Sequence, residues 1–409
     1  MKTLLLIAAL ASTIESPAER KIASARLWLK KDSGSYPARN ALALALARRA
    51  RETGDPAYYR QAEEALEASF RISPDNVEAA RLSVWTLLGK HEFARALEEA
   101  RALNRRMPDD LLTYAFLTDA HVELGNYEEA EEAAQWLLDL RPGNLAGLTR
   151  GGYLRELFGD IDGALEWMLM AHDQTHFNEN EDRAWILTLM GHLEASRGRL
   201  EASEGYLAQA LELFPDYHYA LGELGKVRMA QKRYPEAVSL LRLRYEKAPH
   251  PENLYELAGA LALAGKTEEA EALFATFERQ ARAESEKFDN ANRELLFYYA
   301  DHASEPESAL AIAEREMARR RDVFTRDAFA WALHRSGKSA AARGEIEAAL
   351  AVGIKDARML YHAGAISAAS GDRKAALRYL EESLALNPYS PVATEARESL
   401  QQLEPQVAP

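Results

Sequence analysis

The chain has 409 residues, with 50 Lys and Arg against 64 Asp and Glu, a formal net charge of −14, and no Cys. The negative charge argues against a generic electrostatic footprint for nucleic acid and against binding to anionic membranes. The absence of Cys excludes disulfides, thiol catalysis and thiolate metal sites. Ala, Leu, Glu and Arg dominate the composition, which favours helix over strand.

The first eleven residues contain one Lys, an apolar run from Leu4 to Ala11 and the tripeptide Ala9-Leu10-Ala11. These features are typical of a secretory signal that is cleaved after a small residue. We predict a signal peptide over residues 1–11 and a periplasmic or secreted protein. The alternative is a cytoplasmic protein in which these residues start the first helix. No other stretch approaches the ~20 apolar residues that a membrane helix needs, so no membrane span is expected.

Small and helix-stopping residues recur with a period of 34 residues: Pro74, Pro108 and Pro142, then Pro215 and Pro249, with Ala96, Ala130 and Ala164, then Ala342 and Ala376. A fixed period of this length is typical of stacked helix–turn–helix units. Such units bury their apolar faces only against their neighbours, so a long chain needs no single large core.

The clearest unit covers residues 111–144. Tyr114 and Leu117 share one face of a first helix, and Gly125 with Asn126 breaks that helix. A second helix follows and ends before Pro142. We expect Ala130 to lie where the two helices cross, because a small side chain there lets the backbones approach each other.

This pattern resembles the tetratricopeptide repeat. The unit at 357–390 carries the family's positions as Leu360, Ala363, Gly364, Gly371, Ala376, Leu380 and Pro388. Units at 184–217 and 218–251 carry similar sets, and weaker copies fill the gaps. The resemblance implies a bacterial, all-α, right-handed superhelical solenoid. It would have about ten repeats over most of residues 40–390, with capping helices at both ends.

The phase of the repeats divides the chain into segments. We predict a signal peptide at 1–11, an N-terminal capping helix and linker at 12–39, repeats at 40–178, repeats after a phase break at 179–289, further repeats at 290–390, and a C-terminal capping helix with a tail at 391–409. The phase is interrupted at 172–183 and 279–292, where we expect either a longer loop or an extended helix.

No constellation of residues predicts a reaction. The segment Gly259 to Thr267 has five residues where a P-loop needs four between its first Gly and its Gly-Lys-Thr, and it falls on a repeat turn. His172 and His176 have the i, i+4 spacing of metal ligands beside acidic residues, but acidic loops usually only interact with solvent. We therefore predict no enzymatic activity, no cofactor and no metal, with a site at these two histidines as the least favoured alternative.

In the family, the faces of the first helices line a concave groove that binds the ligand. The matching positions are rich in aromatic and charged residues, which dominate binding hot spots. The predicted groove residues are Arg81, Trp85, Asp119, Tyr153, Trp185, His192, Tyr219, Lys226, Tyr255, Phe324, Trp331, His334, Arg358 and Tyr361. About half of the aromatic residues are expected to fill space between helices instead. The family's chaperone-binding groove clamps a carboxylate with Lys, Asn and Arg, and these positions lack Asn, so that specialisation is not predicted.

Three functional hypotheses follow. The first is a non-enzymatic scaffold that binds a peptide or protein partner in the groove, without nucleic acid and with an undefined oligomeric state. The second is a cytoplasmic regulatory or sensor solenoid whose pitch responds to a ligand. The third is a metal-binding or enzymatic protein.

Overall fold

The computed structural model describes residues 16–403, which form 22 α-helices, one π-helix and no strand. The predicted all-α class is therefore confirmed. The predicted signal peptide at 1–11 and the end of the predicted tail, residues 404–409, lie outside the described residues.

The helices are α2 Pro17–Lys31, α3 Tyr36–Thr53, α4 Ala57–Ile72, α5 Val77–Gly89, α6 Phe93–Arg106, α7 Leu111–Glu123, α8 Tyr127–Leu140, α9 Leu145–Leu157, α10 Ile161–Gln174, α11 Asn180–Ser196, α12 Leu200–Leu213, α13 His218–Ala230, α14 Tyr234–Lys247, α15 Pro251–Leu263, α16 Thr267–Glu284, α17 Asn292–Phe297, η2 Tyr298–His302, α18 Pro306–Arg319, α19 Val323–Arg335, α20 Ser339–Leu350, α21 Ala357–Ala369, α22 Arg373–Leu386 and α23 Ala393–Leu403.

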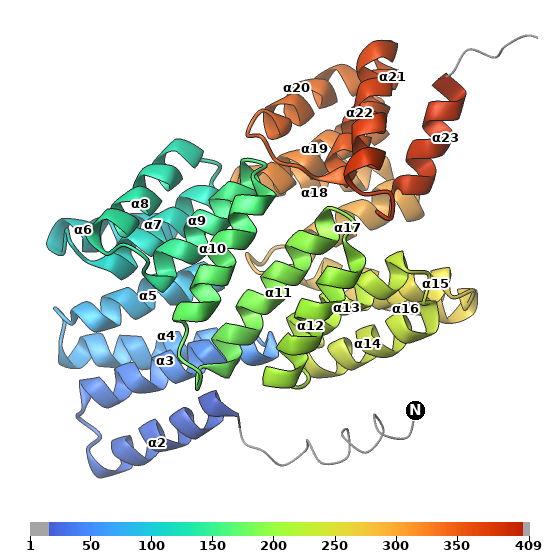
Figure 1. The fold of residues 1–409 in the computed structure, drawn as a ribbon. Coiled ribbons are helices and arrows are strands. Elements are labelled where there is room, and N and C mark those ends of the chain that lie inside the picture. The colour runs from blue at the N-terminus through green and yellow to red at the C-terminus, as the bar shows by residue number, and fades with distance from the viewer. Residues whose placement is uncertain (1–15, 404–409) are drawn as a thin grey trace, which may run out of the picture.

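These helices pack as helix–turn–helix pairs, as the repeat pattern predicts. We number the pairs as repeats 1 to 10, from α3–α4 to α21–α22, with α17 and η2 together forming the first helix of repeat 8. The two remaining helices, α2 and α23, pack on α3 and α22 at the two ends. In Figure 1, α2 to α10 form one stack and α11 to α16 a second, and α18 to α23 lie above the second stack.

Small residues set the distance between the two helices of a repeat. A Cβ added to Gly191 would lie 2.7 Å from Leu207 of the second helix, and one added to Gly364 would meet Leu380 at the same distance. On the second helices, Ala130, Ala309 and Ala376 are completely buried. The crossing therefore has no room for a larger side chain, as the sequence predicts.

The first helices begin at polar caps that follow the periodic prolines. The side chains of Asn76, Asp110 and Asn144 accept hydrogen bonds from the backbone amides of Ala79, Thr113 and Gly147. Such caps satisfy amides that otherwise lack a partner at a helix start. Each of the prolines 74, 108 and 142 lies two residues before a cap residue. The same short segment therefore ends one repeat and starts the next.

Both interruptions of phase combine a loop with helix extension. At the first, α10 ends at Gln174 and α11 begins at Asn180 and runs for 17 residues. At the second, α16 runs for 18 residues, and a loop at 285–291 leads into the short α17. A π-helix at Tyr298–His302 then completes the first helix of repeat 8.

Repeats about six apart in the chain contact each other, and we call this line of contacts the seam. The backbone amide of Arg321 donates to the carbonyl oxygen of Glu123 at 3.1 Å, and that of Val323 donates to the Tyr127 hydroxyl at 2.8 Å. These bonds join repeat 3 to the start of repeat 9. At the C-terminal end of repeat 10, the side-chain amide of Asn387 donates to the carbonyl oxygen of Ala195 in repeat 5 at 2.9 Å.

Apolar packing continues across the seam. A single buried cluster includes Val122 and Leu157 of repeats 3 and 4 together with Val323 and Ile354 near the starts of repeats 9 and 10. Between repeats 4 and 10 the backbones touch, since a Cβ on Gly159 would lie 2.4 Å from the carbonyl oxygen of Gly353. The chain therefore winds through more than one superhelical turn, and successive turns are in contact.

Candidate binding site on the inner face

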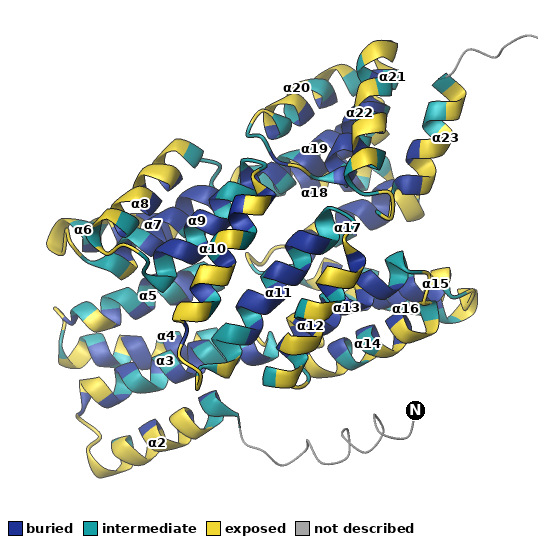
Figure 2. Cartoon of the chain, in the orientation of Figure 1, coloured by how far each residue is buried: buried dark blue, intermediate teal, exposed yellow. Residues whose placement is uncertain are grey.

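The second helices carry the exposed surface, and the first helices lie mostly inside (Figure 2). We call the side of the first helices that faces away from the second helices the inner face. The seam joins the turns around this face, so a ligand on it would contact several repeats at once.

A ladder of ion pairs crosses the inner face over four consecutive first helices, α9, α11, α13 and α15. His192 lies 3.3 Å from Glu156 and 3.3 Å from Glu223. Lys226 continues the ladder, with its Nζ 2.8 Å from Glu223 and 3.3 Å from Glu256. Two predicted groove residues, His192 and Lys226, are thus brought into one network.

The ladder fixes the charge of its members. Burial opposes a charge on His192, but hydrogen bonds to Glu156 and Glu223 outweigh it and raise the pKa of His192 well above its usual range. Burial likewise disfavours the Glu223 carboxylate, yet Lys226 and His192 hold the pKa of Glu223 well below its usual value. His192 and Lys226 still leave 46% and 45% of their side chains exposed. The ladder therefore presents fixed charges to solvent.

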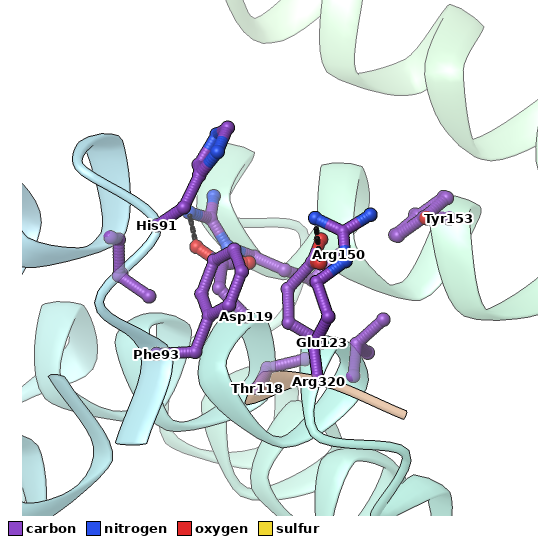
Figure 3. A pocket seen from close by; sticks show the side chains of 10 residues that line it. His91, Phe93, Thr118, Asp119, Glu123, Arg150, Tyr153 and Arg320 are labelled. Atoms are coloured by element: carbon purple, nitrogen blue, oxygen red, sulfur yellow. Dashed lines mark hydrogen bonds and ion pairs between the residues drawn. The ribbon is translucent and has the colours of Figure 1, made fainter. Parts of the chain in front are cut away.

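A pocket of about 230 Å³ opens beside the ladder (Figure 3). We call it the wall pocket; its lining residues are Leu88, His91, Phe93, Thr118, Asp119, Val122, Glu123, Arg150, Tyr153 and Arg320. All but one come from repeats 2 to 4. Arg320 comes from the loop before α19, so the pocket is complete only when the seam is closed.

The wall pocket combines an apolar floor with a rim of paired charges. Arg150 binds Asp119 through two hydrogen bonds of 3.0 and 2.6 Å, and Arg320 lies 3.4 Å from Glu123 and over the ring of Phe93 (Figure 3). Burial raises the pKa of the Glu123 carboxyl to about 7, although Arg320 opposes the shift. The rim can therefore both donate and accept hydrogen bonds near neutral pH.

Two of the predicted groove residues, Asp119 and Tyr153, line the wall pocket. Burial raises the pKa of the Tyr153 hydroxyl, so it stays protonated and available as a donor. Tyr219 is 41% exposed and its ring lies 3.9 Å from that of His218.

Other predicted groove residues contribute to packing between helices. Trp331 is only 5% exposed, donates through Nε1 to Asp301 at 2.9 Å and stacks on His362. Its neighbours His334 and Tyr361 contact its ring at 5.1 and 5.8 Å. This group is a buried aromatic cluster of repeats 8 to 10.

The remaining predicted residues are held by structural contacts. Arg81 forms an ion pair with the cap residue Asp110, and Trp85 packs between two apolar clusters. Trp185 lies under the guanidinium of Arg51, and Tyr255 packs on Phe277.

Phe324 and Arg358 both take part in cation–π contacts. The guanidinium of Arg293 lies 5.2 Å from the Phe324 ring, and that of Arg358 lies 5.3 Å from the Phe297 ring. These pairs link α17 to α19 and α21.

Sequence reasoning missed Glu123, Arg150 and Arg320. Arg150 could have been found, because it stands 31 residues after Asp119 and so falls on the next first helix. Arg320 could not, since its partner Glu123 is nearly 200 residues away in the chain. Helix α18 ends at Arg319, so Arg320 follows the helix and reaches Glu123 of the other turn.

The histidines singled out as metal ligands do not share a helix face. His172 lies on α10 beside Arg183, whereas His176 lies in the following loop, where its Nδ1 accepts from the amide of Asn178. Among residues 16–403, no group of three or more His, Cys, Asp or Glu side chains is placed to hold a metal ion. Within the same residues, no helix is both long and apolar enough to cross a membrane.

Sequence models of the tetratricopeptide repeat match parts of the chain. One model matches residues 117–176 and 188–251, and a second matches 357–390. These segments fall on repeats 3 to 6 and repeat 10. No curated protein sequence matches the chain significantly.

Solved structures with the same fold include human IFIT1 bound to m7Gppp-AAAA, with a TM-score of 0.52, 13% identity, and coverage of 92% of this chain and 96% of that chain. The Cut9 and Hcn1 hetero-tetramer of the APC/C gives a TM-score of 0.46 at 15% identity, covering 92% of this chain and 57% of that one. A thermophilic tetratricopeptide-repeat protein from Thermus thermophilus gives 0.42 at 22% identity, covering 48% of this chain and all of the other. The present chain thus spans little more than half the length of the matched APC/C chain.

Proposed function

Because the chain is a tetratricopeptide-repeat protein, we propose that it is a non-enzymatic scaffold whose inner face binds an extended segment of a protein partner. The observation that carries this proposal is the ladder, which holds exposed charges in fixed positions over four repeats. An extended peptide can contact such a row at regular intervals, and the wall pocket beside it has room for a side chain.

The chemistry of the inner face favours a peptide over a phosphate-rich ligand. One IFIT1 structure contains m7Gppp-AAAA, but this chain carries a net charge of −14, and its inner-face cations Lys226 and Arg320 already form ion pairs with carboxylates. A polyphosphate would have to displace those carboxylates. A peptide with both amide groups and charged side chains can bind without doing so.

The experiment is affinity capture from extract of the native host with immobilised protein, followed by direct titration of the identified partner. Lys226→Gln and Tyr153→Ala should each weaken binding at least tenfold, because hot-spot contacts commonly contribute more than ~1.4 kcal/mol. Arg242→Gln is the matched control, since its 2.6 Å ion pair with Glu269 joins two second helices and is similarly exposed. If all three variants bind equally well, the inner face is not the binding surface.

A second candidate function is a sensor whose superhelical pitch responds to ligand. The wall pocket favours it, because Arg320 of one turn and Glu123 of another both line it. A ligand there would change the distance between the turns. Small-angle scattering with and without the captured partner distinguishes the two functions, since a plain scaffold keeps its shape.

We further propose that the protein acts outside the cytoplasm, on the strength of the signal-like pattern at residues 1–11. N-terminal sequencing of protein from the native host tests this proposal. A start near Ser12 supports export, whereas a start at Met1 or Lys2 supports a cytoplasmic role.

A further inference from the structure

Two histidines close the seam between repeat 1 and repeats 6 and 7. His218 Nε2 lies 3.1 Å from the carbonyl oxygen of Arg51, and His250 Nε2 contacts the carbonyl oxygen of Gly54. Both carbonyls lie at the C-terminal end of α3, and both rings lie at the starts of first helices, α13 and α15. Because a carbonyl oxygen only accepts, each ring donates through Nε2–H.

The second nitrogen of His218 has no partner. The side chain is 4% exposed, and its Nδ1 is buried without a hydrogen bond. The titratable and charged groups around the ring are Arg51 of α3, Arg244 of α14, His250 before α15, the flanking Tyr217 and Tyr219, and Glu181 of α11, which binds both Arg51 and the Tyr217 hydroxyl.

A proton on Nδ1 of His218 would therefore be a buried donor without an acceptor. It would also place a positive charge beside Arg244, while the nearby carboxylate of Glu181 is already engaged by Arg51 and Tyr217. Burying an unpaired polar group or charge is costly, so the protonated ring favours a state in which water reaches it.

We propose that this part of the seam is an acid-sensitive latch, which stays closed while His218 is neutral and opens when His218 takes up a proton. Opening separates repeat 1 from repeats 6 and 7 and gives a side entrance to the inner face. The latch does not depend on which partner binds there.

The sign and size of the effect follow from the burial of the ring. Burial lowers the pKa of His218 to about 4, with Arg244 and His250 acting in the same direction and the Arg51 carbonyl opposing. In the open state the ring returns to its ordinary pKa of about 6.5. The closed state is therefore favoured above about pH 6.5 and loses stability as pH falls toward 4. Proton linkage makes opening roughly 30-fold more frequent at pH 5.0 than at pH 7.5.

On the neighbouring part of the seam, His91 of repeat 2 faces a carboxylate, unlike His218. Its Nδ1 lies 3.7 Å from Asp289 of the loop before α17. Burial lowers the pKa of His91, with Asp289 opposing and Arg320 adding to the shift.

The test uses a single cysteine, because the chain has none of its own. Ala248 is fully buried at the seam, with its Cβ 3.3 Å from the position of a Cβ on Gly54. The reaction of Ala248→Cys with 4,4′-dithiodipyridine is timed at pH 7.5 and 5.0. Each rate is divided by that of the urea-unfolded variant at the same pH, which removes the chemistry of the thiol. We expect the normalised rate to rise roughly 30-fold at pH 5.0.

Three further variants decide the cause. Adding His218→Gln, whose amide can still donate to the Arg51 carbonyl, should remove most of the rise, whereas adding His302→Gln, away from this contact, should leave it. Ala349→Cys, buried on α20, reports general unfolding and should show no rise. The proposal fails if Ala248→Cys does not respond to pH, if His218→Gln responds as fully as the parent, or if Ala349→Cys rises equally.

Discussion

Replacing Gly159 with Ala tests the contact between turns, and Gly337 provides a matched control. Both glycines occupy the turn between the two helices of a repeat, with φ of +82° and +75°. An Ala in this left-handed region costs about 1–2 kcal/mol in either position. Only at Gly159 would the new Cβ meet another turn, 2.4 Å from the Gly353 carbonyl oxygen; at Gly337 nothing lies within 4 Å.

The clash adds ~1–3 kcal/mol to the cost of Gly159→Ala, because neither backbone can yield without moving a whole repeat. The extra cost is limited by the stability of the seam itself, since the turns can separate instead. Urea unfolding followed by circular dichroism measures both variants. A solenoid need not unfold in one step, so the midpoints of the first transition are compared. Equal midpoints for Gly159→Ala and Gly337→Ala would refute the contact.

Three other predictions concern the repeats, the seam and the ladder. Ala130→Leu, Ala309→Leu and Ala376→Leu should each cost ~1–3 kcal/mol of unfolding free energy by overpacking a helix crossing, whereas Ala340→Leu, at an exposed position, should change it by less than about 0.5 kcal/mol. Tyr127→Phe removes the acceptor of the Val323 amide and should lower the free energy of unfolding by ~1–3 kcal/mol. Tyr234→Phe, at the same position of repeat 6, should lower it less, because the Tyr234 hydroxyl accepts no such bond. His192 has a raised pKa, so the stability that it contributes is complete below about pH 6.5 and is lost as pH rises through its folded-state pKa. A denaturation series from pH 6 to 9 should show this loss in the parent, and a slope retained in His192→Gln would contradict it.

Local features of the fold could be predicted because the same residue types recur at the same positions in successive repeats. Ala130 and Ala376 lie at helix crossings, and the prolines at 74, 108 and 142 follow the ends of second helices, as the period implied. The weak copies were harder. In the turn Gly54-Asp55-Pro56 the positive φ falls on the first residue, whereas the other repeats place it on the second. The π-helix at Tyr298–His302 recurs in no other repeat of residues 16–403. No pattern in the chain anticipated the π-helix.

The superhelical pitch could not be predicted from the same pattern. The pitch results from a small rotation between each repeat and the next, added up over many repeats. The periodic sequence pattern does not determine this total rotation. The pairing of Arg320 with Glu123 and of His218 with the Arg51 carbonyl depends on that sum, because the partners lie in different turns. For the same reason, the inner-face residues His192 and Lys226 were identified singly, while the ladder that joins them was not.

The contact between superhelical turns is tested most directly by a disulfide between Gly54→Cys and Ala248→Cys. The two Cβ positions lie 3.3 Å apart, close to the ~3.5–4.5 Å of a natural disulfide, and the chain has no other cysteine. Mild oxidation at pH 7.5 should therefore give an intramolecular disulfide in nearly all of the monomer. A pair of Gly265→Cys and Ala248→Cys, whose glycine has nothing within 4 Å, should give none. If the first pair also stays reduced, or bonds only between molecules, the turns do not meet and the closed inner face is wrong.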